Sequence, residues 1–256
     1  MICDLELTCY PAHDCCTLTQ SIIMNVVITG SSRGLGKAMA EKFAASGHPL
    51  FLTSRNEEAL YQVMGELLNK HPHLTIHAKA FDLRNKKQAQ DAGQWALDTA
   101  GKIDVLVNNA GLFLSGSVYN EEAGVLEEMI ETNLYSAYHL TRALLPSMMK
   151  QKRGHIFNIC SIASLNAYPN GGSYSISKFA LAGFSKNLRE EMKPFGIKVT
   201  AVYPGAVYTD SWAGSGVDPR RIMESADIAD MVYAASILSP QATVEEILLR
   251  PQLGDL

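Results

Sequence analysis

The stretch TGSSRGLG, residues Thr29 to Gly36, decides the fold of this chain. It follows a short apolar run, NVVIT (residues 25–29), and leads into an amphipathic stretch at residues 35–46. Glycines at such a turn let the backbone come close to a phosphate, and the free N–H groups of the following helix attract the anion. A plain glycine-rich turn is the alternative. The position between the first strand and the first helix favours a nucleotide site.

Short apolar runs alternate with amphipathic stretches along the rest of the chain. We expect strands at residues 25–29, 49–54, 74–81, 103–108, 155–160, 197–203 and 244–250. We expect helices at residues 35–46, 56–70, 121–133, 134–150 and 172–193, with further helices starting near 85 and 225. Nearly all-apolar strands separated by helices are typical of parallel sheets. The pattern predicts one α/β domain, a doubly wound Rossmann fold with a seven-stranded parallel sheet and helices on both faces.

The composition excludes several other classes of protein. The 256 residues are 47% hydrophobic and 19% charged, with a net charge of -4, and a nucleic-acid binder usually carries a basic excess. No apolar run approaches the roughly 18 residues of a membrane-spanning helix. The first basic residue is Arg33, so the N-terminus has no positive region of a secretory signal. We therefore expect a cytoplasmic protein without nucleic-acid or membrane partners.

Four of the five cysteines lie in the first 16 residues: Cys3, Cys9, Cys15 and Cys16. A zinc site completed by His13 is one interpretation, but the spacings differ from paired zinc-ligand patterns. The other is a poorly ordered extension, or an upstream start codon with Met24 as the natural first residue. We predict no metal, an extension at residues 1–23 and one nucleotide-binding domain at residues 24–256.

The end of the second expected strand indicates which nucleotide binds. An NAD site usually has Asp or Glu there to hold the ribose 2′-hydroxyl, but this chain reads Thr53, Ser54, Arg55. Arg55 can pair with a 2′-phosphate, and Arg33 in the glycine turn can reach the same group. Both arginines could instead be ordinary surface residues. Two arginines and the missing acid predict NADP(H).

Tyr174 and Lys178, in the motif YSISK, form the expected catalytic centre. Four residues apart on a helix, they share one face. A free tyrosine has a pKa of about 10, and a nearby ammonium is expected to lower it, so that Tyr174 can exchange a proton with a carbonyl or alcohol oxygen. Ser161 could donate a hydrogen bond to that oxygen, and Asn133 could hold a proton-relaying water. Alone, such a Tyr–Lys pair is usually a surface pair.

Together these motifs resemble the short-chain dehydrogenase/reductase family. The resemblance covers about residues 25–208 and includes TGSSRGLG, NNAG (Asn108 to Gly111), YSISK and PGAVYT (Pro204 to Thr209). It implies an NADP-dependent oxidoreductase with the catalytic tetrad Asn133, Ser161, Tyr174 and Lys178. It also implies homotetramers or homodimers that pack through the two long helices ahead of the fifth and sixth strands.

The resemblance also implies where the cofactor lies: Lys178 on the nicotinamide ribose, Asp82 near the adenine, and Val207 and Thr209 at the carboxamide and phosphates. The full set of expected cofactor-binding residues is Gly30, Ser32, Arg33, Gly34, Leu35, Gly36, Ser54, Arg55, Asp82, Leu83, Asn109, Ala110, Gly111, Tyr174, Lys178, Pro204, Gly205, Val207 and Thr209.

The substrate is less well defined. Apolar and aromatic residues in the loops beyond the sheet suit a flat or hydrophobic ketone, although they could equally be core or lid packing. The candidates are Leu112, Phe113, Leu165, Tyr168, Tyr208 and Trp212. The chain end VEEILLRPQLGD resembles sepiapterin reductase-type members, in which an acidic residue such as Asp255 meets a polar substrate group.

Three other readings stay open. One is an enzyme similar to 3-oxoacyl-(acyl-carrier-protein) reductases. Another is a non-catalytic NADP(H)-sensing protein on the same fold, since fold does not dictate function. The third is a metal-binding or interaction role of the cysteine-rich N-terminus.

Overall fold

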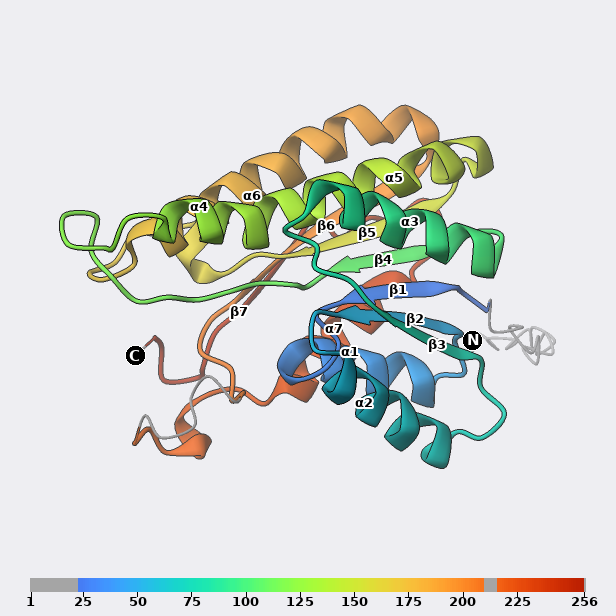
Figure 1. The fold of residues 1–256 in the computed structure, drawn as a ribbon, viewed down its shortest axis with the longest axis horizontal. Helices are drawn as coiled ribbons and strands as arrows, with labels where there is room; N and C mark the ends of the chain where they lie inside the picture. Colours follow the sequence, from blue (N-terminus) through green and yellow to red (C-terminus); the bar gives the residue numbers. More distant parts are fainter. Residues whose placement is uncertain (1–22, 210–215, 256) are drawn as a thin grey trace, which may run out of the picture.

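The computed structural model describes residues 23–209 and 216–255, which contain a fully parallel seven-stranded sheet (Figure 1). The strand order is β3-β2-β1-β4-β5-β6-β7. The strands are β1 (Val26–Thr29), β2 (Leu50–Ser54), β3 (Ile76–Ala80), β4 (Val105–Asn108), β5 (Gly154–Ile159), β6 (Ile197–Pro204) and β7 (Glu246–Leu249). All seven strands fall within the expected apolar runs or one residue beyond them.

Helices cover both faces of the sheet. Figure 1 shows α1, α2 and α7 on one side and α3, α4, α5 and α6 on the other. Their bounds are α1 (Gly34–Ala45), α2 (Glu57–Lys70), α3 (Lys86–Ala100), α4 (Val125–Ile130), α5 (Ser136–Gln151), α6 (Gly172–Met192) and α7 (Ser225–Ser236). Short 3₁₀ turns lie at η2 (Ile162–Ser164), η3 (Lys193–Phe195) and η5 (Pro219–Arg221). The predicted doubly wound Rossmann fold is confirmed.

The strands are apolar throughout because both faces of the sheet are buried. Along β1, Val26 and Ile28 join the core cluster that includes α1 and α7 residues, whereas Val27 joins the cluster on the α3 and α5 side. Successive side chains of a strand point to opposite faces, so a central strand needs an apolar residue at every position. The apolar run in the sequence therefore predicted this strand correctly.

The order of the strands places the ligand crevice. Strand β1 pairs with β2 on one side and with β4 on the other, so the crossovers that leave β1 and β4 run in opposite directions. In open α/β sheets, ligands bind beyond the carboxyl ends of the strands at this reversal. The glycine turn after β1 and the NNAG motif at the end of β4 meet there.

The expectation of two helices at residues 121–133 and 134–150 is wrong in detail. Residues 121–124 are not helical, and Gly124 adopts the left-handed conformation, with φ of 93°, just before α4. From Val125 to Gln151 the chain is one helical run, in which the π-helical turn η1 (Glu131–Tyr135) joins α4 to α5. The expected junction at residues 133 and 134 falls inside this π-helical turn, so the prediction differs from the structure in the start of the first helix and in the continuity of the run.

Local capping is partly as expected. Gly47, with φ of 80°, follows the last turn of α1, and Asn56 accepts a hydrogen bond from the Ala59 amide at the start of α2. Asn85 caps α3 in the same way. The spacing of Asn85 and Gln88 in the sequence resembles a capping box, but the Gln88 side chain accepts from the Asp82 amide at 2.8 Å instead of bonding back to Asn85. It thereby fixes the turn after β3.

Within residues 23–209 and 216–255, no helix has the length and apolar character needed to cross a bilayer. The expected extension up to residue 22, with its four cysteines and His13, lies outside these residues, and so does Trp212.

Candidate active site

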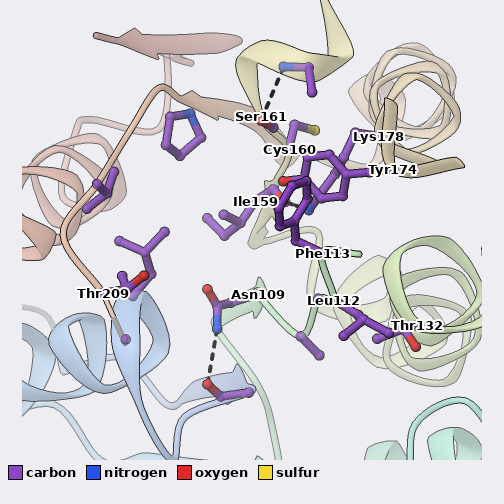
Figure 2. A pocket seen from close by; sticks show the side chains of 18 of the residues that line it. Asn109, Leu112, Phe113, Thr132, Ile159, Cys160, Ser161, Tyr174, Lys178 and Thr209 are labelled. Carbon is purple, nitrogen blue, oxygen red and sulfur yellow. Dashed lines mark hydrogen bonds between the residues drawn. The ribbon is translucent and has the colours of Figure 1, made fainter. Parts of the chain in front are cut away.

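A cleft of about 960 Å³ opens at the carboxyl ends of the strands. Most of the expected site residues line it: Gly30, Ser32, Arg33, Gly34, Leu35, Ser54, Arg55, Leu83, Asn109, Ala110, Gly111, Leu112, Phe113, Ser161, Tyr168, Tyr174, Lys178, Pro204, Gly205, Val207, Thr209 and Asp255. Figure 2 shows Ser161, Tyr174 and Lys178 toward one side of this space and Asn109 and Thr209 toward the other. Residues far apart in the sequence therefore share one cavity.

The glycine turn forms the phosphate end of the cleft. Gly30 and Gly34 have φ values of 64° and 54°, in the left-handed region that favours glycine. Gly36 does not line the cleft but packs against the turn, where a Cβ would lie 2.2 Å from the Gly30 carbonyl oxygen. No side chain caps α1 at Arg33, and its first turn holds no acidic residue. These features fit a dinucleotide diphosphate.

The end of β2 has the groups expected for a 2′-phosphate. The hydroxyl oxygens of Ser32, in the glycine turn, and Ser54, at the end of β2, lie 2.8 Å apart. Arg33 and Arg55 line the same end of the cleft. No Asp or Glu lines this part of the cleft among the described residues. An anionic phosphate there meets cations and hydroxyls instead of a carboxylate.

Asp82 itself does not line the cleft; its neighbours Leu83 and Arg84 do. The Arg84 guanidinium binds both carboxylate oxygens of Asp82, with Nη2 2.6 Å from Oδ2, and also pairs with Glu128. These contacts hold the pKa of Asp82 below its usual value. Sequence reasoning missed Arg84, although its place two residues after Asp82 was a usable signal.

The NNAG segment mainly joins strands. The Asn109 side chain donates to the Thr29 carbonyl at 2.9 Å, and the Asn109 and Ala110 amides donate to the Thr29 hydroxyl. Asn108 is buried and donates to Asn158 on β5. The motif therefore fixes the end of β4 against the end of β1 and shapes the floor of the cleft.

Helix α6 presents Tyr174 and Lys178 to the cleft. Lys178 is 5% exposed, and its ammonium donates to the Ile159 carbonyl at 2.8 Å and lies 5.8 Å from the centre of the Tyr174 ring. The Phe113 ring meets the Tyr174 ring edge to face, with centroids 4.9 Å apart (Figure 2). Ser161, after β5, faces the same space.

The pKa of Tyr174 moves opposite to the prediction from sequence. Burial raises it, and the Ser161 side chain opposes this rise only in part. Burial also lowers the pKa of Lys178 to about 8. Desolvation by the surrounding protein is therefore the largest influence on the pKa of each of the two groups. The phenol is therefore protonated at neutral pH.

Asn133 lies in the π-helical turn η1, behind the cleft wall. Its Oδ1 accepts from the Leu112 amide at 2.7 Å, and its Nδ2 donates to the Leu112 carbonyl and to the Ser177 hydroxyl. These bonds anchor the loop after β4 to α6. The side chain is thus engaged with protein groups, which leaves its backbone as the part that could serve the expected proton relay.

The expected substrate residues divide into two groups. Phe113 and Tyr168 line the cleft and are 49% and 41% exposed, so both are available to a ligand. Leu165 packs instead against the small core cluster around Cys160 and Tyr203. Tyr208 lines a separate hollow of about 230 Å³ beside Lys37 and Ser225. The sequence placed these residues near the cleft but could not tell which way their side chains point.

Two further residues that line the cleft were not anticipated. Cys160 precedes Ser161, and burial raises the pKa of its thiol to about 11, so it stays protonated at neutral pH. Arg250 follows β7 and pairs with Asp255 at 2.5 Å. Arg221 holds the same tail by donating to the carbonyls of Leu253, Gly254 and Asp255. The C-terminal segment therefore forms a wall of the cleft.

The fold and the cleft together define a dinucleotide-dependent oxidoreductase of the Rossmann type. Comparison with known proteins places it more closely: residues 24–218 match the family described as short chain dehydrogenase. The chain belongs to this family and is an oxidoreductase.

Similar proteins include dehydrogenase/reductase SDR family member 7B of Xenopus laevis, 39% identical over 193 residues, which are 72% of this chain and 58% of the frog protein. An uncharacterized oxidoreductase of Staphylococcus epidermidis is 31% identical over 225 residues, which are 88% of this chain and 96% of the staphylococcal protein.

Solved structures agree on the fold. An alcohol dehydrogenase from the archaeon Thermococcus sibiricus, complexed with 5-hydroxy-NADP, has a TM-score of 0.83 and 28% identity over 90% of this chain and 97% of its own. A metagenomic short-chain oxidoreductase in complex with NADP has a TM-score of 0.79 and 32% identity, over 90% of this chain and 97% of its own.

Proposed function

We propose that this protein is an NADPH-dependent carbonyl reductase that interconverts a ketone and a secondary alcohol. The observation that carries the proposal is one cleft that holds the phosphate-binding turn at one end and Tyr174, Lys178 and Ser161 at the other. A dinucleotide bound in this cleft runs from the phosphate-binding turn toward the acid–base group. That group then stands where the reacting carbonyl would lie.

The choice of NADP(H) rests on Arg33, Arg55 and the two serine hydroxyls at the end of β2. Two similar structures contain NADP or a derivative of it, which supports the same choice. The remaining cofactor residues keep the roles expected from the sequence, except that Gly36 and Asp82 act from behind the cleft wall.

When bound, NADPH supplies hydride to the carbonyl carbon. Tyr174 gives its phenolic proton to the carbonyl oxygen, so that the substrate gains one hydride and one proton and becomes an alcohol. Burial, by raising the pKa of Tyr174, keeps this proton in place at neutral pH. Ser161 donates a hydrogen bond to the same oxygen, and the Lys178 ammonium stabilises the phenolate that remains.

The substrate end favours an apolar or aromatic ketone, because Phe113 and Tyr168 present exposed rings to it. A sepiapterin-like compound or a diketone fits this description. An enzyme similar to 3-oxoacyl-(acyl-carrier-protein) reductases is the second candidate, and a non-catalytic NADP(H) sensor is the third. The sensor is less favoured because its cleft would not need the acid–base pair.

A substrate panel tests the proposal. Purified protein is mixed with NADPH or NADH and with sepiapterin, diketones, acetoacetyl thioesters or sugars, and loss of absorbance at 340 nm is followed. We expect turnover with NADPH on at least one ketone and much less with NADH. NADPH binding without turnover on any carbonyl would favour the sensor, and absence of binding would remove both readings.

Self-association is a further part of the proposal. Apolar side chains on η1 and α6 are exposed, among them Tyr135, Ile176 and Phe179. They support a homodimer or homotetramer that packs through the helices ahead of β5 and β6. Light scattering at micromolar concentration should give a mass of two or four chains, and a monomer would contradict this.

A further inference from the structure

We propose that Glu121 is a positioning residue for Tyr174: it fixes the first turn of α6 from the loop that follows β4. The proposal rests on the proposed function, because it assigns Glu121 a part in the same proton transfer. Glu121 does not line the cleft, so it acts through Tyr174 and not on the cofactor or substrate.

The contact itself is specific. Glu121 Oε1 accepts from the Ser173 amide at 2.8 Å, and Oε2 accepts from the Ser173 hydroxyl. The first amides of a helix have no partner within the helix, and Gly171, before α6, offers no side chain to cap them. Ser173 is only 2% exposed, so water cannot readily replace the carboxylate. Glu121 therefore caps α6 from a distant part of the chain, one residue before Tyr174.

The space around Gly172, at the start of α6, is too small for a larger side chain. A Cβ at Gly172 would lie 2.1 Å from Glu121 Oε1 and 2.6 Å from the Gly116 carbonyl oxygen. The loop is tied a second time, because the Gly116 amide donates to the Asn170 carbonyl and the Ser117 hydroxyl donates to the Asn170 side chain. The loop and the start of α6 thus fit closely together.

The same loop holds Tyr174 from its other end. Asn133 grips the backbone of Leu112, and the next residue, Phe113, packs its ring on the Tyr174 ring. Tyr174 is therefore held through its ring by Phe113, and the residue before it, Ser173, is held by Glu121. Both contacts come from residues 112–121, of which Leu112 and Phe113 line the cleft.

Loss of the cap should affect chemistry more than binding. A shift of about 1 Å in a reacting group can cost on the order of 100-fold in rate. The cofactor residues on β1, β2 and β4 do not depend on Glu121. We therefore expect Glu121→Ala to lower kcat about 10- to 100-fold and to leave the KM for NADPH within about twofold.

Three variants make the kinetic test. Glu121→Gln keeps the shape of the side chain and can still bond both groups of Ser173, so it should retain kcat within about threefold. Glu122→Ala removes the neighbouring exposed carboxylate, which does not contact α6, and should resemble the unmodified protein. The kcat ratio between H₂O and D₂O should rise in Glu121→Ala only, because a misplaced phenol slows proton transfer.

Hydrogen exchange tests the same claim without a substrate. Amides of the first turn of α6 should exchange at least about tenfold faster in Glu121→Ala than in Glu122→Ala, with α1 unchanged. Equal exchange rates would overturn the proposal, even if no substrate were known. Normal kcat and D₂O ratio in Glu121→Ala would overturn it as well. An unmodified protein that turns over no carbonyl would instead count against the proposed function, and the exchange result would still decide the role of Glu121.

Discussion

A buried ionisable group lies at each end of strand β5, His155 on the strand itself and Lys178 on α6, and the two groups behave differently. At its start, His155 is 4% exposed, and burial lowers its pKa to about 3. At its other end, the carbonyl of Ile159 accepts from Lys178, which is 5% exposed and has its pKa lowered by burial to about 8. Equal burial therefore leaves one group neutral and the other largely charged at neutral pH.

The contacts of His155 and Lys178 differ in kind. His155 bonds the Thr200 hydroxyl at 2.7 Å and stacks on Phe157 with centroids 3.9 Å apart, which suits a neutral ring in a packed core. Among residues 23–209 and 216–255, Lys178 has one hydrogen-bond partner, the backbone carbonyl of Ile159, and it faces an open cleft. At the amino end of the sheet, the buried His155 is thus neutral and packed. At the carboxyl end, the buried charge of Lys178 lowers the stability of the folded protein, which is typical of a residue kept for function.

The largest effect is expected from Lys178→Met. Turnover should fall about 1,000-fold or more, because the phenolate loses its stabilising charge. The free energy of unfolding at pH 7 should rise by about 2 kcal/mol. Removing the buried ammonium stabilises the folded protein by about 3 kcal/mol, and losing its hydrogen bond destabilises it by about 1 kcal/mol. Steady-state kinetics and urea unfolding measure the two quantities.

Lys186→Met is the matched control for that change. Lys186 lies on the same helix with a side chain that is 69% exposed, so both quantities should stay nearly unchanged. A Lys178→Met protein that is less stable than the unmodified one would show that the buried ammonium does not destabilise the folded protein.

A smaller effect is expected from Arg55→Asp, which changes a charge at the carboxyl end of β2. The ratio of kcat/KM for NADPH to that for NADH should fall about 100-fold, because a carboxylate repels the 2′-phosphate and can bind a 2′-hydroxyl. Arg153→Asp makes the same charge change just before β5, at the amino end of the sheet, and should leave the ratio unaltered. Unchanged preference in Arg55→Asp would contradict the assignment of this arginine.

The smallest effect concerns acid stability. A histidine whose pKa is lowered by folding stabilises the protein fully above its unfolded pKa of about 6.5, and this contribution is lost as pH falls toward about 3. Between pH 7 and pH 4.5, His155 should therefore account for roughly 2 to 3 kcal/mol of the lost stability. His155→Gln should lose that much less than the unmodified protein when both are unfolded in urea at the two pH values. Equal losses would mean that His155 is protonated in the folded state.

Periodicity and motif spacing predicted the sheet, its helices and the gathering of Tyr174, Lys178 and the glycine turn. These features depend on local pattern: Val26 to Ile28 must be apolar on both faces, and a strand–turn–helix sequence fixes where Gly30 lies. The π-helical turn at Asn133 was not predictable, because it depends on bonds to Leu112 and Ser177 from other elements.

Side-chain direction and burial set the limit for the site as well. The direction of the Tyr174 pKa shift was wrong because sequence shows the neighbouring ammonium but not the depth at which both groups lie. Leu165 packs against a core cluster and the exposed Tyr208 lines a separate hollow, and no motif encodes either placement. Glu121 lies 52 residues from Ser173, and only the folded chain brings the two together.

The most direct test of the central claim is a single-turnover measurement on Tyr174→Phe with bound NADPH and a ketone that the panel identifies. We expect NADPH affinity within about twofold and a rate of NADPH oxidation at least about 1,000-fold lower, since only the phenolic proton is missing. Tyr61→Phe, an exposed tyrosine on α2, should react at the normal rate. A Tyr174→Phe protein that oxidises NADPH within about threefold of the normal rate would contradict the claim that Tyr174 supplies the proton.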